Sequence, residues 1–275
     1  MPELPEVETV RRSLAAHVVG QQIVAVDVRR SDVVAAPEHG EMFPMALMER
    51  TIEGLERRGK YLLMALSDNL WLVVHLRMTG RWVLTAPETP EPAHTHVILR
   101  LSGGQELRYT DPRRFGRLRL VSADGLALCP GLSTLGPEPL DPAYRPEHLA
   151  EALARRTTRI KALLLDQHVI AGLGNIYADE ALAMAAIHPD RPASSLTTDE
   201  VACLYQSIQR VLQAGIDAKG TSFRDYVDGE GQKGAFQEQL WVYGREGEPC
   251  RRCGGTILRA KRGGRSAHFC PYCQV

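Results

Sequence analysis

Four of the six cysteines lie in one pattern near the C-terminal end: Cys250, Cys253, Cys270 and Cys273. Two Cys-x2-Cys pairs separated by 16 residues have the spacing of a zinc site. Four thiolates would occupy every position of a tetrahedral ion, so such a zinc ion would be structural and would leave no position for a substrate. Because a tail of 26 residues cannot bury a core of its own, metal binding would supply its folding free energy.

The rest of the chain divides into a region of short strands followed by a region of helices. Between residues 22 and 110, short apolar stretches alternate with turns that contain Gly, Pro or Asn, a pattern typical of a β-sandwich or barrel. Strands are expected at residues 22–35, 51–58, 60–66, 70–76, 81–85, 96–102 and 106–110. Helices are expected at residues 148–154, 160–166, 176–185 and 198–218. Thr197 and Glu200 form a capping box for the last helix.

Proline and glycine concentrate between the two regions, which favours a domain boundary there. We expect a multidomain α+β protein in four parts. These are an N-terminal helix with a β-sandwich at 1–130, a linker at 131–146, a helical domain at 147–235 and the zinc module at 236–275. Within the helical domain, residues 220–234 are rich in Gly, Asp and Ser and are expected to form a mobile loop.

Positive charge is distributed unevenly along the chain, although the net charge is zero. Lys plus Arg and Asp plus Glu are both 33, so the formal net charge is zero. Positive charge nevertheless gathers at residues 113–119, at 155–161 and from 250 to the end, where there are six Arg or Lys and no acid. A single charge run is usually a solvated face, but three clusters together favour a nucleic-acid partner. The chain shows no membrane span and no signal peptide, so a soluble, cytoplasmic protein is expected.

The first six residues combine a helix start with a candidate nucleophile. Pro5 suits a first helical turn, because the N–H that proline lacks would be unpaired there. Once Met1 is removed, Pro2 presents a secondary amine that can attack an electrophilic carbon and form an iminium ion. Glu3 and Glu6 lie three residues apart, about one helical turn, so both are close to that amine and Glu3 can move protons. By themselves such residues usually form only a helix start.

The stretch Met-Pro-Glu-Leu-Pro-Glu-Val-Glu-Thr at residues 1–9 resembles the N-terminus of bacterial formamidopyrimidine-DNA glycosylases. The related endonuclease VIII proteins usually carry Gly where this chain has Leu4. Further motifs follow in the order of the family, so that the resemblance runs from Pro2 to Cys273. They are Gly59-Lys-Tyr, His75-Leu-Arg-Met-Thr-Gly, Asp111-Pro-Arg-Arg-Phe-Gly, the Gly172-Leu-Gly-Asn turn, Gly220-Thr-Ser-Phe-Arg-Asp-Tyr-Val and the cysteine pattern.

The resemblance implies a bifunctional DNA glycosylase and AP lyase that removes 8-oxoguanine and formamidopyrimidines from duplex DNA. It also implies β,δ-elimination through a Schiff base at the N-terminal proline, a helix–two-turn–helix domain and a C-terminal zinc-finger β-hairpin. The residues implied in catalysis are Pro2, Glu3, Lys60 and Arg265, with Glu6 in support. The residues implied in DNA binding are His75, Met78, Arg113, Phe115, Lys161 and Asn175.

Several of these roles are specific. Lys60 would be directed to the active site and a DNA phosphate, and Arg265 would grip the phosphates around the flipped nucleotide. Residues matching Met78, Arg113 and Phe115 fill the gap left by the extruded base and probe the opposite cytosine in the family. His75 and Asn175 would contact phosphates, and Lys161 would belong to the DNA-binding helix–two-turn–helix element. The stretch Gly220-Thr-Ser-Phe-Arg-Asp-Tyr-Val would belong to the loop that closes over the extruded purine. Without the resemblance, a turn lysine is usually surface, a Met or Phe near a turn is usually core, and a histidine is often a satisfied buried imidazole.

Other functions compete with this interpretation. A non-catalytic zinc-ribbon protein that binds nucleic acid would explain the basic clusters but not Pro2-Glu3. An endonuclease VIII-like glycosylase would act on oxidised pyrimidines instead. An isomerase with an N-terminal proline base would need neither the zinc module nor the basic turns. We favour a monomeric bacterial repair enzyme with one structural zinc and no organic cofactor, acting near the nucleoid on DNA with the lesion opposite cytosine.

Overall fold

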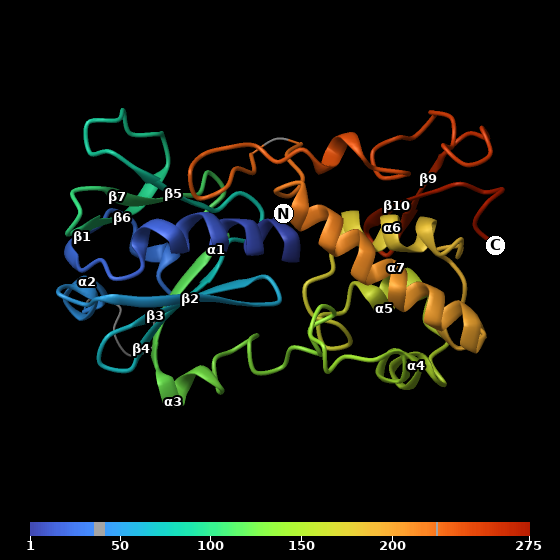
Figure 1. The fold of residues 1–275 in the computed structure, drawn as a ribbon, viewed down its shortest axis with the longest axis horizontal. Coiled ribbons are helices and arrows are strands. Elements are labelled where there is room, and N and C mark those ends of the chain that lie inside the picture. Colours follow the sequence, from blue (N-terminus) through green and yellow to red (C-terminus); the bar gives the residue numbers. More distant parts are fainter. Residues whose placement is uncertain (36–41, 224) are drawn as a thin grey trace. The chain divides into compact units, whose positions relative to one another are not determined.

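The computed structural model describes residues 1–35, 42–223 and 225–275, and Figure 1 traces them along the chain. They form two compact units, which are described separately. The first comprises residues 1–133 and 218–235, and the second residues 134–217 and 236–275. In the described residues, no helix is both long and apolar enough to cross a membrane.

The first unit begins with helix α1 (Leu4–Val18), which has proline in its first turn. As the sequence predicts, Val7, Val10 and Leu14 lie on its buried face. The side chain of Glu6 accepts a hydrogen bond from the backbone N–H of Glu3 at 2.8 Å and thereby caps the helix. The start of the chain is therefore held in place by its own first turn.

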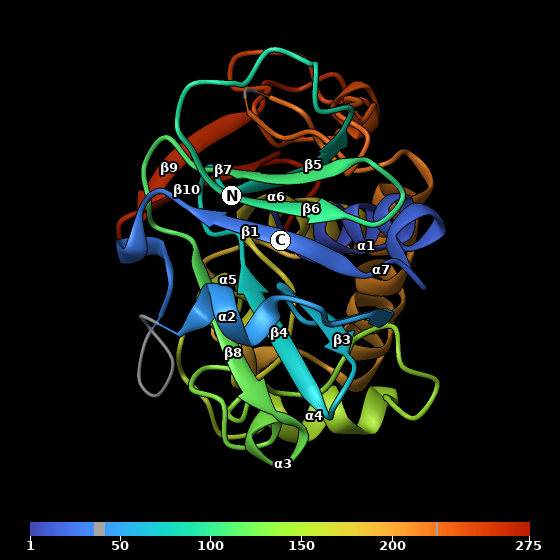
Figure 2. The ribbon, with the colours of Figure 1, turned by 90° about the vertical axis from the view of Figure 1, so that its left-hand side faces the viewer.

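Two four-stranded antiparallel sheets form the body of this unit, in the orders β1-β6-β7-β5 and β2-β3-β4-β8, and Figure 2 looks onto them. The strands are β1 (Ile23–Val28), β2 (Ile52–Arg58), β3 (Tyr61–Leu66), β4 (Leu70–His75), β5 (Arg81–Thr85), β6 (Thr95–Leu101), β7 (Glu106–Thr110) and β8 (Arg117–Ser122). Short helices α2 (Phe43–Leu47) and α3 (Ala123–Leu126) accompany them. The predicted sandwich is confirmed, although the strand expected at 22–35 ends at Val28.

The sequence did not predict β8. Its Arg117 and Arg119 look like a basic cluster, but they alternate with Leu118 and Leu120, which are buried. This period-two pattern is that of a half-buried strand, and β8 pairs with β4 along its whole length.

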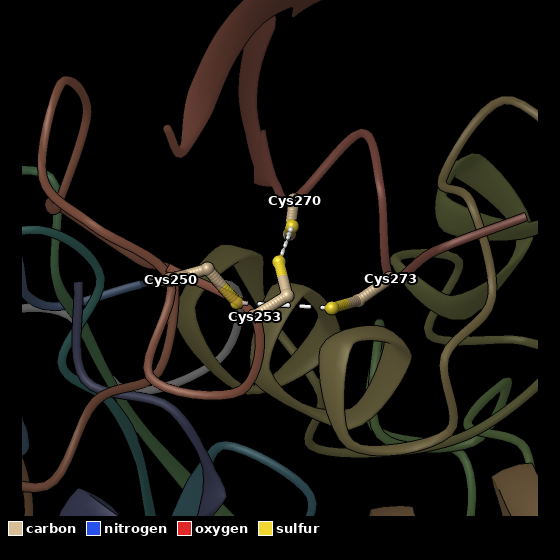
Figure 3. Close-up of side chains that lie close together, drawn as sticks. All are labelled: Cys250, Cys253, Cys270 and Cys273. Carbon is tan, nitrogen blue, oxygen red and sulfur yellow. Dashed lines mark hydrogen bonds between the residues drawn. The ribbon is translucent and has the colours of Figure 1, made fainter. Parts of the chain in front are cut away.

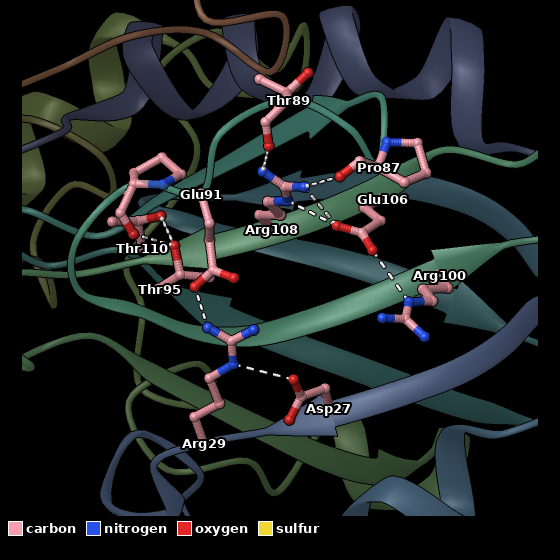
Figure 4. Close-up of polar contacts among 11 residues, drawn as sticks. Asp27, Arg29, Pro87, Thr89, Glu91, Thr95, Arg100, Glu106, Arg108 and Thr110 are labelled. Atoms are coloured by element: carbon pink, nitrogen blue, oxygen red, sulfur yellow. Dashed lines mark hydrogen bonds and ion pairs between the residues drawn. The ribbon is translucent and has the colours of Figure 1, made fainter.

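A buried ion pair fixes one loop of the first sheet (Figure 4). Arg108 on β7 is only 4% exposed and pairs with Glu106 at 2.7 Å. Its guanidinium also donates to the backbone oxygens of Thr89 at 2.9 Å and Pro87 at 3.1 Å. Glu106 accepts a further hydrogen bond from Arg100 at 3.0 Å, so the charges of this cluster are compensated.

Residues 218–235, which the sequence predicts as part of the helical domain, belong to the first compact unit. Gly229 accounts for much of this docking: its N–H donates to Ser13 Oγ at 2.9 Å and its oxygen accepts from the N–H of Leu84 at 2.8 Å. Asp228 closes a tight turn by accepting from the N–H groups of Glu230 and Gln232. Residues 228–232 are therefore anchored, contrary to the mobile loop expected there. Arg224, in the same predicted loop, lies outside the described residues.

The second unit contains the helices that the sequence predicts, within a few residues. They are α4 (Pro146–Leu153), α5 (Ile160–Leu164), α6 (Asn175–Met184) and α7 (Thr198–Asp217). The capping box is confirmed, since Thr197 N–H donates to Glu200 at 2.8 Å and Glu200 N–H to the Thr197 hydroxyl at 3.3 Å. A hairpin of β9 (Leu258–Arg262) and β10 (Arg265–Phe269) completes the unit.

The stretch from residue 134 to 146 is part of this unit and not a linker. The N–H of Gly136 donates to the oxygen of Gln167 at 2.8 Å, and the N–H of Ala171 donates to the oxygen of Pro137 at 3.0 Å. A Cβ at Gly136 would lie 2.6 Å from the oxygen of His168, so only glycine fits. The proline-rich segment is thus docked onto the turn before α6.

The C-terminal segment, residues 236–275, belongs to the second compact unit together with the helices. Glu180 on α6 is 1% exposed, and burial raises the pKa of its carboxyl group. It accepts the N–H groups of Trp241, Val242 and Tyr243 at 2.7–2.9 Å. One helix therefore holds the chain that leads into the cysteine-rich module.

Candidate functional site

The N-terminal candidates lie together at the start of α1. Glu3 is the residue before the helix, in an extended conformation, and is 3% exposed. One oxygen of Glu6 accepts from Glu3 N–H at 2.8 Å, and the other accepts from Thr221 N–H at 2.8 Å. Glu6 therefore connects the Pro2-Glu3 segment to residues 218–235. The nitrogen of Pro2 is an amide nitrogen while Met1 is attached, and it becomes an amine when Met1 is removed.

Lys60 and His75 lie at neighbouring strand ends. Lys60 sits in the turn between β2 and β3 and is 5% exposed, so it is not an ordinary surface lysine. The next residue, Tyr61, pairs with His75 across β3 and β4. Burial lowers the pKa of His75 to about 3, helped by the charges of Arg77 and Lys60. The imidazole is therefore neutral at pH 7.

The hydrogen bonds of His75 select its tautomer. Nδ1 accepts from the N–H of Arg77 at 3.0 Å, so the ring proton is on Nε2. A neutral imidazole with an N–H donor can bind a phosphate oxygen without adding charge. This geometry keeps both interpretations of His75 open, because the ring is buried and still retains a donor.

Two loops carry the residues expected to enter the DNA stack. We call residues 76–80 and 111–116 the probe loops. Met78 is 41% exposed and Phe115 is 48% exposed, so both side chains can reach a partner at the surface. The Arg113 guanidinium lies 4.6 Å from the centre of the Phe115 ring. The structure thus brings Arg113 and Phe115 together as one exposed pair.

In the second unit, Asn175 is the first residue of α6, and Gly174 caps the helix in an extended conformation. Gly172 has a φ of +90°, which favours glycine. The Asn175 side-chain oxygen is buried without a hydrogen-bond partner among the described residues. The backbone N–H groups at the start of this 10-residue helix are donors that suit a phosphate.

Lys161, a predicted DNA-binding residue, has partners within the protein. Its side chain is only 6% exposed and its ammonium lies 2.6 Å from Asp179 Oδ1. The ammonium also donates to the backbone oxygen of Ser266. Asp179 in turn accepts the N–H of His268 at 2.9 Å. Lys161 therefore ties α5 to α6 and to β10, because a buried ammonium requires such partners.

Asp179 is a residue that the sequence analysis missed. It follows Asn175 by one helical turn and is fully buried. An acid within the apolar sequence Ile-Tyr-Ala-Asp-Glu-Ala-Leu is the signal that could have found it, since buried carboxylates need donors.

Arg265 is exposed at the first residue of β10, directly after a turn made by Gly263 and Gly264, both with positive φ. It lines a cavity of about 450 Å³ together with Arg159 and Arg262. Arg262 is neutralised by Asp190 at 2.8 Å. The exposed guanidinium of Arg265 at this basic cavity is suited to a phosphate.

The four cysteines meet at one point (Figure 3). Their sulfur atoms all lie within 4.8 Å of one another, with Cys250 to Cys273 at 3.9 Å and Cys253 to Cys270 at 3.5 Å. Zn–S bonds of about 2.3 Å in a tetrahedron require sulfur atoms about 3.8 Å apart. Burial raises the pKa of Cys250, but backbone N–H groups outweigh it and lower this pKa to about 7. The cluster therefore fits a zinc ion.

Comparison with known proteins covers the whole chain. Residues 1–118 match the family described as "Formamidopyrimidine-DNA glycosylase N-terminal domain", and residues 135–227 match "Formamidopyrimidine-DNA glycosylase H2TH domain". Residues 247–275 match "Zinc finger found in FPG and IleRS", which together with the thiolate geometry identifies one structural zinc site. The formamidopyrimidine-DNA glycosylase of Heliobacterium modesticaldum is 58% identical, with 100% of both chains covered. That of Desulforamulus reducens is 51% identical, over 100% of this chain and 99% of the relative.

Solved structures of Fpg proteins are also similar to this chain. A Lactococcus lactis Fpg in complex with DNA that contains an abasic site is 39% identical, with a TM-score of 0.93 and 99% of each chain covered. A mutant of the same protein bound to DNA that contains Fapy-dG has the same identity, TM-score and coverage.

Proposed function

The chain belongs to the formamidopyrimidine-DNA glycosylase family, and on that premise we propose that it excises oxidised purines from duplex DNA and then cleaves the strand at the abasic site. The observation that carries this proposal is the Pro2-Glu3 terminus, held by the side chain of Glu6 at the start of α1. The matched domains place this terminus in a family of DNA glycosylases, and relatives have been solved with damaged DNA. The function is base-excision repair.

The proposed reaction begins once Met1 is removed. The Pro2 amine attacks C1′ of the damaged nucleotide, and the C1′–N bond to the base breaks, so that the base leaves. Loss of a proton and opening of the sugar give a Schiff base between Pro2 and C1′. Glu3 transfers protons during these steps. β-Elimination and then δ-elimination release the two phosphates and leave a gap of one nucleoside.

The remaining residues of the first unit would act on DNA and not on the bond being broken. Lys60 and the Nε2–H of His75 would bind a phosphate, because one brings charge and the other a neutral donor. Met78 and Phe115 would fill the space of the extruded base, which must leave the stack before its sugar can react. Arg113 would donate to the O2 acceptor of the orphaned cytosine.

In the second unit, Asn175 and Arg265 would bind phosphates, and the zinc ion would supply only folding free energy to the hairpin that carries Arg265. Zinc would be held by Cys250, Cys253, Cys270 and Cys273. We further propose that the protein acts as a monomer on the chromosomal DNA in the cytoplasm, with the lesion opposite cytosine. The complexes of L. lactis Fpg with damaged DNA support the DNA partner in this proposal.

Covalent capture tests the proposed function. Borohydride added to the protein with duplex DNA containing 8-oxoguanine opposite cytosine should reduce the Schiff base to a stable adduct. A matched pair isolates the amine: the same chain with a cleavable N-terminal extension, and the chain after cleavage has exposed Pro2. Only the cleaved protein should be trapped. Equal trapping of both would exclude Pro2 as the nucleophile and would direct attention to Lys60.

A further inference from the structure

Asp111 is a fully buried carboxylate directly after the last residue of β7. Its Oδ1 accepts from the hydroxyl of Thr79 and from the N–H of Arg113 at 3.2 Å. Its Oδ2 accepts from the N–H of Gly116 at 2.8 Å and from the hydroxyl of Tyr109 at 3.2 Å. Thr79 lies in one probe loop, and Arg113 and Gly116 lie in the other. A single carboxylate therefore joins the two loops.

The hydroxyl of Tyr109 lies close to a glycine in each probe loop. A Cβ at Gly116 would lie 1.9 Å from the Tyr109 hydroxyl, and a Cβ at Gly80 would lie 2.7 Å from it. Only glycine therefore allows each probe loop to pack this closely against the Tyr109 hydroxyl, which donates a hydrogen bond to Asp111. The centre of the Tyr109 ring lies 5.3 Å from that of the Trp82 ring, and this packing holds the phenol in place.

The probe loops need such a support, because their backbones include unfavourable conformations. Arg77 has a φ of +52° and Arg114 a φ of +54°, which is rare for residues other than glycine. Conformations of this kind persist only where the surroundings determine them. The neighbours of these two residues are Met78, Arg113 and Phe115, the exposed side chains expected to enter the stack.

We propose that Asp111 is the positioning residue that holds Met78 and the Arg113–Phe115 pair in one arrangement before DNA binds. It thereby sets the readout of the opposite base and the extrusion of the lesion, without taking part in the chemistry at the sugar. This inference rests on the proposed function. Its physical basis is that fixed side chains lose less conformational entropy on binding than mobile ones.

The charge of Asp111 is essential to this role. All four groups that face it are donors, and a carboxylate is acceptor-only. Asparagine has almost the same shape, but its NH2 group would meet donors and replace an acceptor with a repulsive contact. Asp111→Asn should therefore loosen the link between the probe loops with little change in volume.

The test compares Asp111→Asn with wild type on three duplexes, by single-turnover excision on two of them and by borohydride trapping on the third. With 8-oxoguanine opposite cytosine, the rate should fall about tenfold or more, as expected for the loss of a charge-assisted hydrogen bond. The preference for cytosine over adenine opposite the lesion should also decrease. Borohydride trapping at a preformed abasic site should change by less than about twofold, because no base has to be extruded. Arg113→Ala provides the reference value for lost readout.

Two further variants separate positioning from general destabilisation. Glu106→Gln alters a buried carboxylate on the same strand whose partners are Arg100 and Arg108 (Figure 4). It should lower the melting temperature and leave the base preference unchanged. Thr79→Val removes one of the donors to Asp111 and should reduce the preference in the same direction, whereas Thr79→Ser should restore it. If Asp111→Asn does not fold, the comparison of Thr79→Val with Thr79→Ser tests the positioning role.

The outcomes distinguish the two proposals. A wild-type protein that neither excises the lesion nor forms the adduct would overturn the proposed function. An active wild type combined with unchanged rates and base preference in Asp111→Asn and Thr79→Val would overturn the positioning role. Equal losses on all three duplexes, or an equal loss of preference in Glu106→Gln, would also overturn it.

Discussion

Replacing Asp179 with asparagine should weaken the second unit more than any exposed substitution. Asp179 is fully buried and the side chain of its partner Lys161 is 6% exposed. The asparagine can still accept from the N–H of His268, but it removes the carboxylate charge that lies 2.6 Å from the ammonium of Lys161. Removing one partner of a buried ion pair typically costs about 3–5 kcal/mol.

That free energy predicts a measurable change in melting temperature. For a chain of this size, a loss of about 3–5 kcal/mol lowers the melting temperature by roughly 6–20 °C. Because Asp179 holds the backbone of His268, two residues before Cys270, the variant should also release zinc faster to a chromogenic chelator. Both can be followed on the full chain, by calorimetry and by absorbance.

Two controls define the cause. Lys161→Met combined with Asp179→Asn removes the uncompensated charge and should recover part of the lost stability. Glu151→Gln changes an exposed acid on α4 and should stay within about 0.5 kcal/mol of wild type. If Asp179→Asn melts within about 2 °C of wild type and keeps its zinc, the ion pair does not hold the hairpin and the reasoning fails.

Two other predictions concern Arg265 and His75. Arg265→Ala should weaken binding of damaged and undamaged duplex alike by about 1–3 kcal/mol, measured by fluorescence anisotropy; unchanged affinity would contradict a phosphate contact. Because burial lowers the pKa of His75 from 6.5 to about 3, the unfolded chain binds a proton between these pH values that the folded protein does not. Stability should therefore fall as pH decreases from 6.5, and His75→Gln should remove up to about 1.4 kcal/mol per pH unit of that slope in urea unfolding.

Local patterns in the sequence were enough to predict much of the fold. The apolar spacing of Val7, Val10 and Leu14 predicted α1, and the cysteine spacing predicted the zinc site, because both depend on residues close together in the chain. Where the interpretation failed, the determining contacts are between distant residues. Gly136 looks like part of a flexible linker, but its N–H is bonded to Gln167. Gly229 looks like part of a mobile loop, but it is bonded to Ser13 and Leu84.

The residues of the candidate site also fall into those that a local motif identifies and those that depend on a distant partner. Pro2, Glu3 and Arg265 could be named from motifs, and their roles stay predictions. Lys161 was assigned to DNA binding because it matches a residue of the family, and nothing local in the sequence indicates that its ammonium lies beside Asp179. A charged side chain can be buried only where a partner compensates it, and the partner of Lys161 is Asp179, 18 residues further along the chain.

Three buried carboxylates show why these partners matter for function. Glu6, Asp111 and Asp179 each accept backbone N–H groups, from Glu3 and Thr221, from Arg113 and Gly116, and from His268. Loops and helix starts have N–H groups that no regular structure satisfies, and a carboxylate can accept several of them at once. Each of these acids lies within four residues of a predicted functional residue: Glu3, Arg113 or Asn175. An acid that interrupts an apolar stretch beside such a motif therefore indicates which loop must be held rigid for the motif to act.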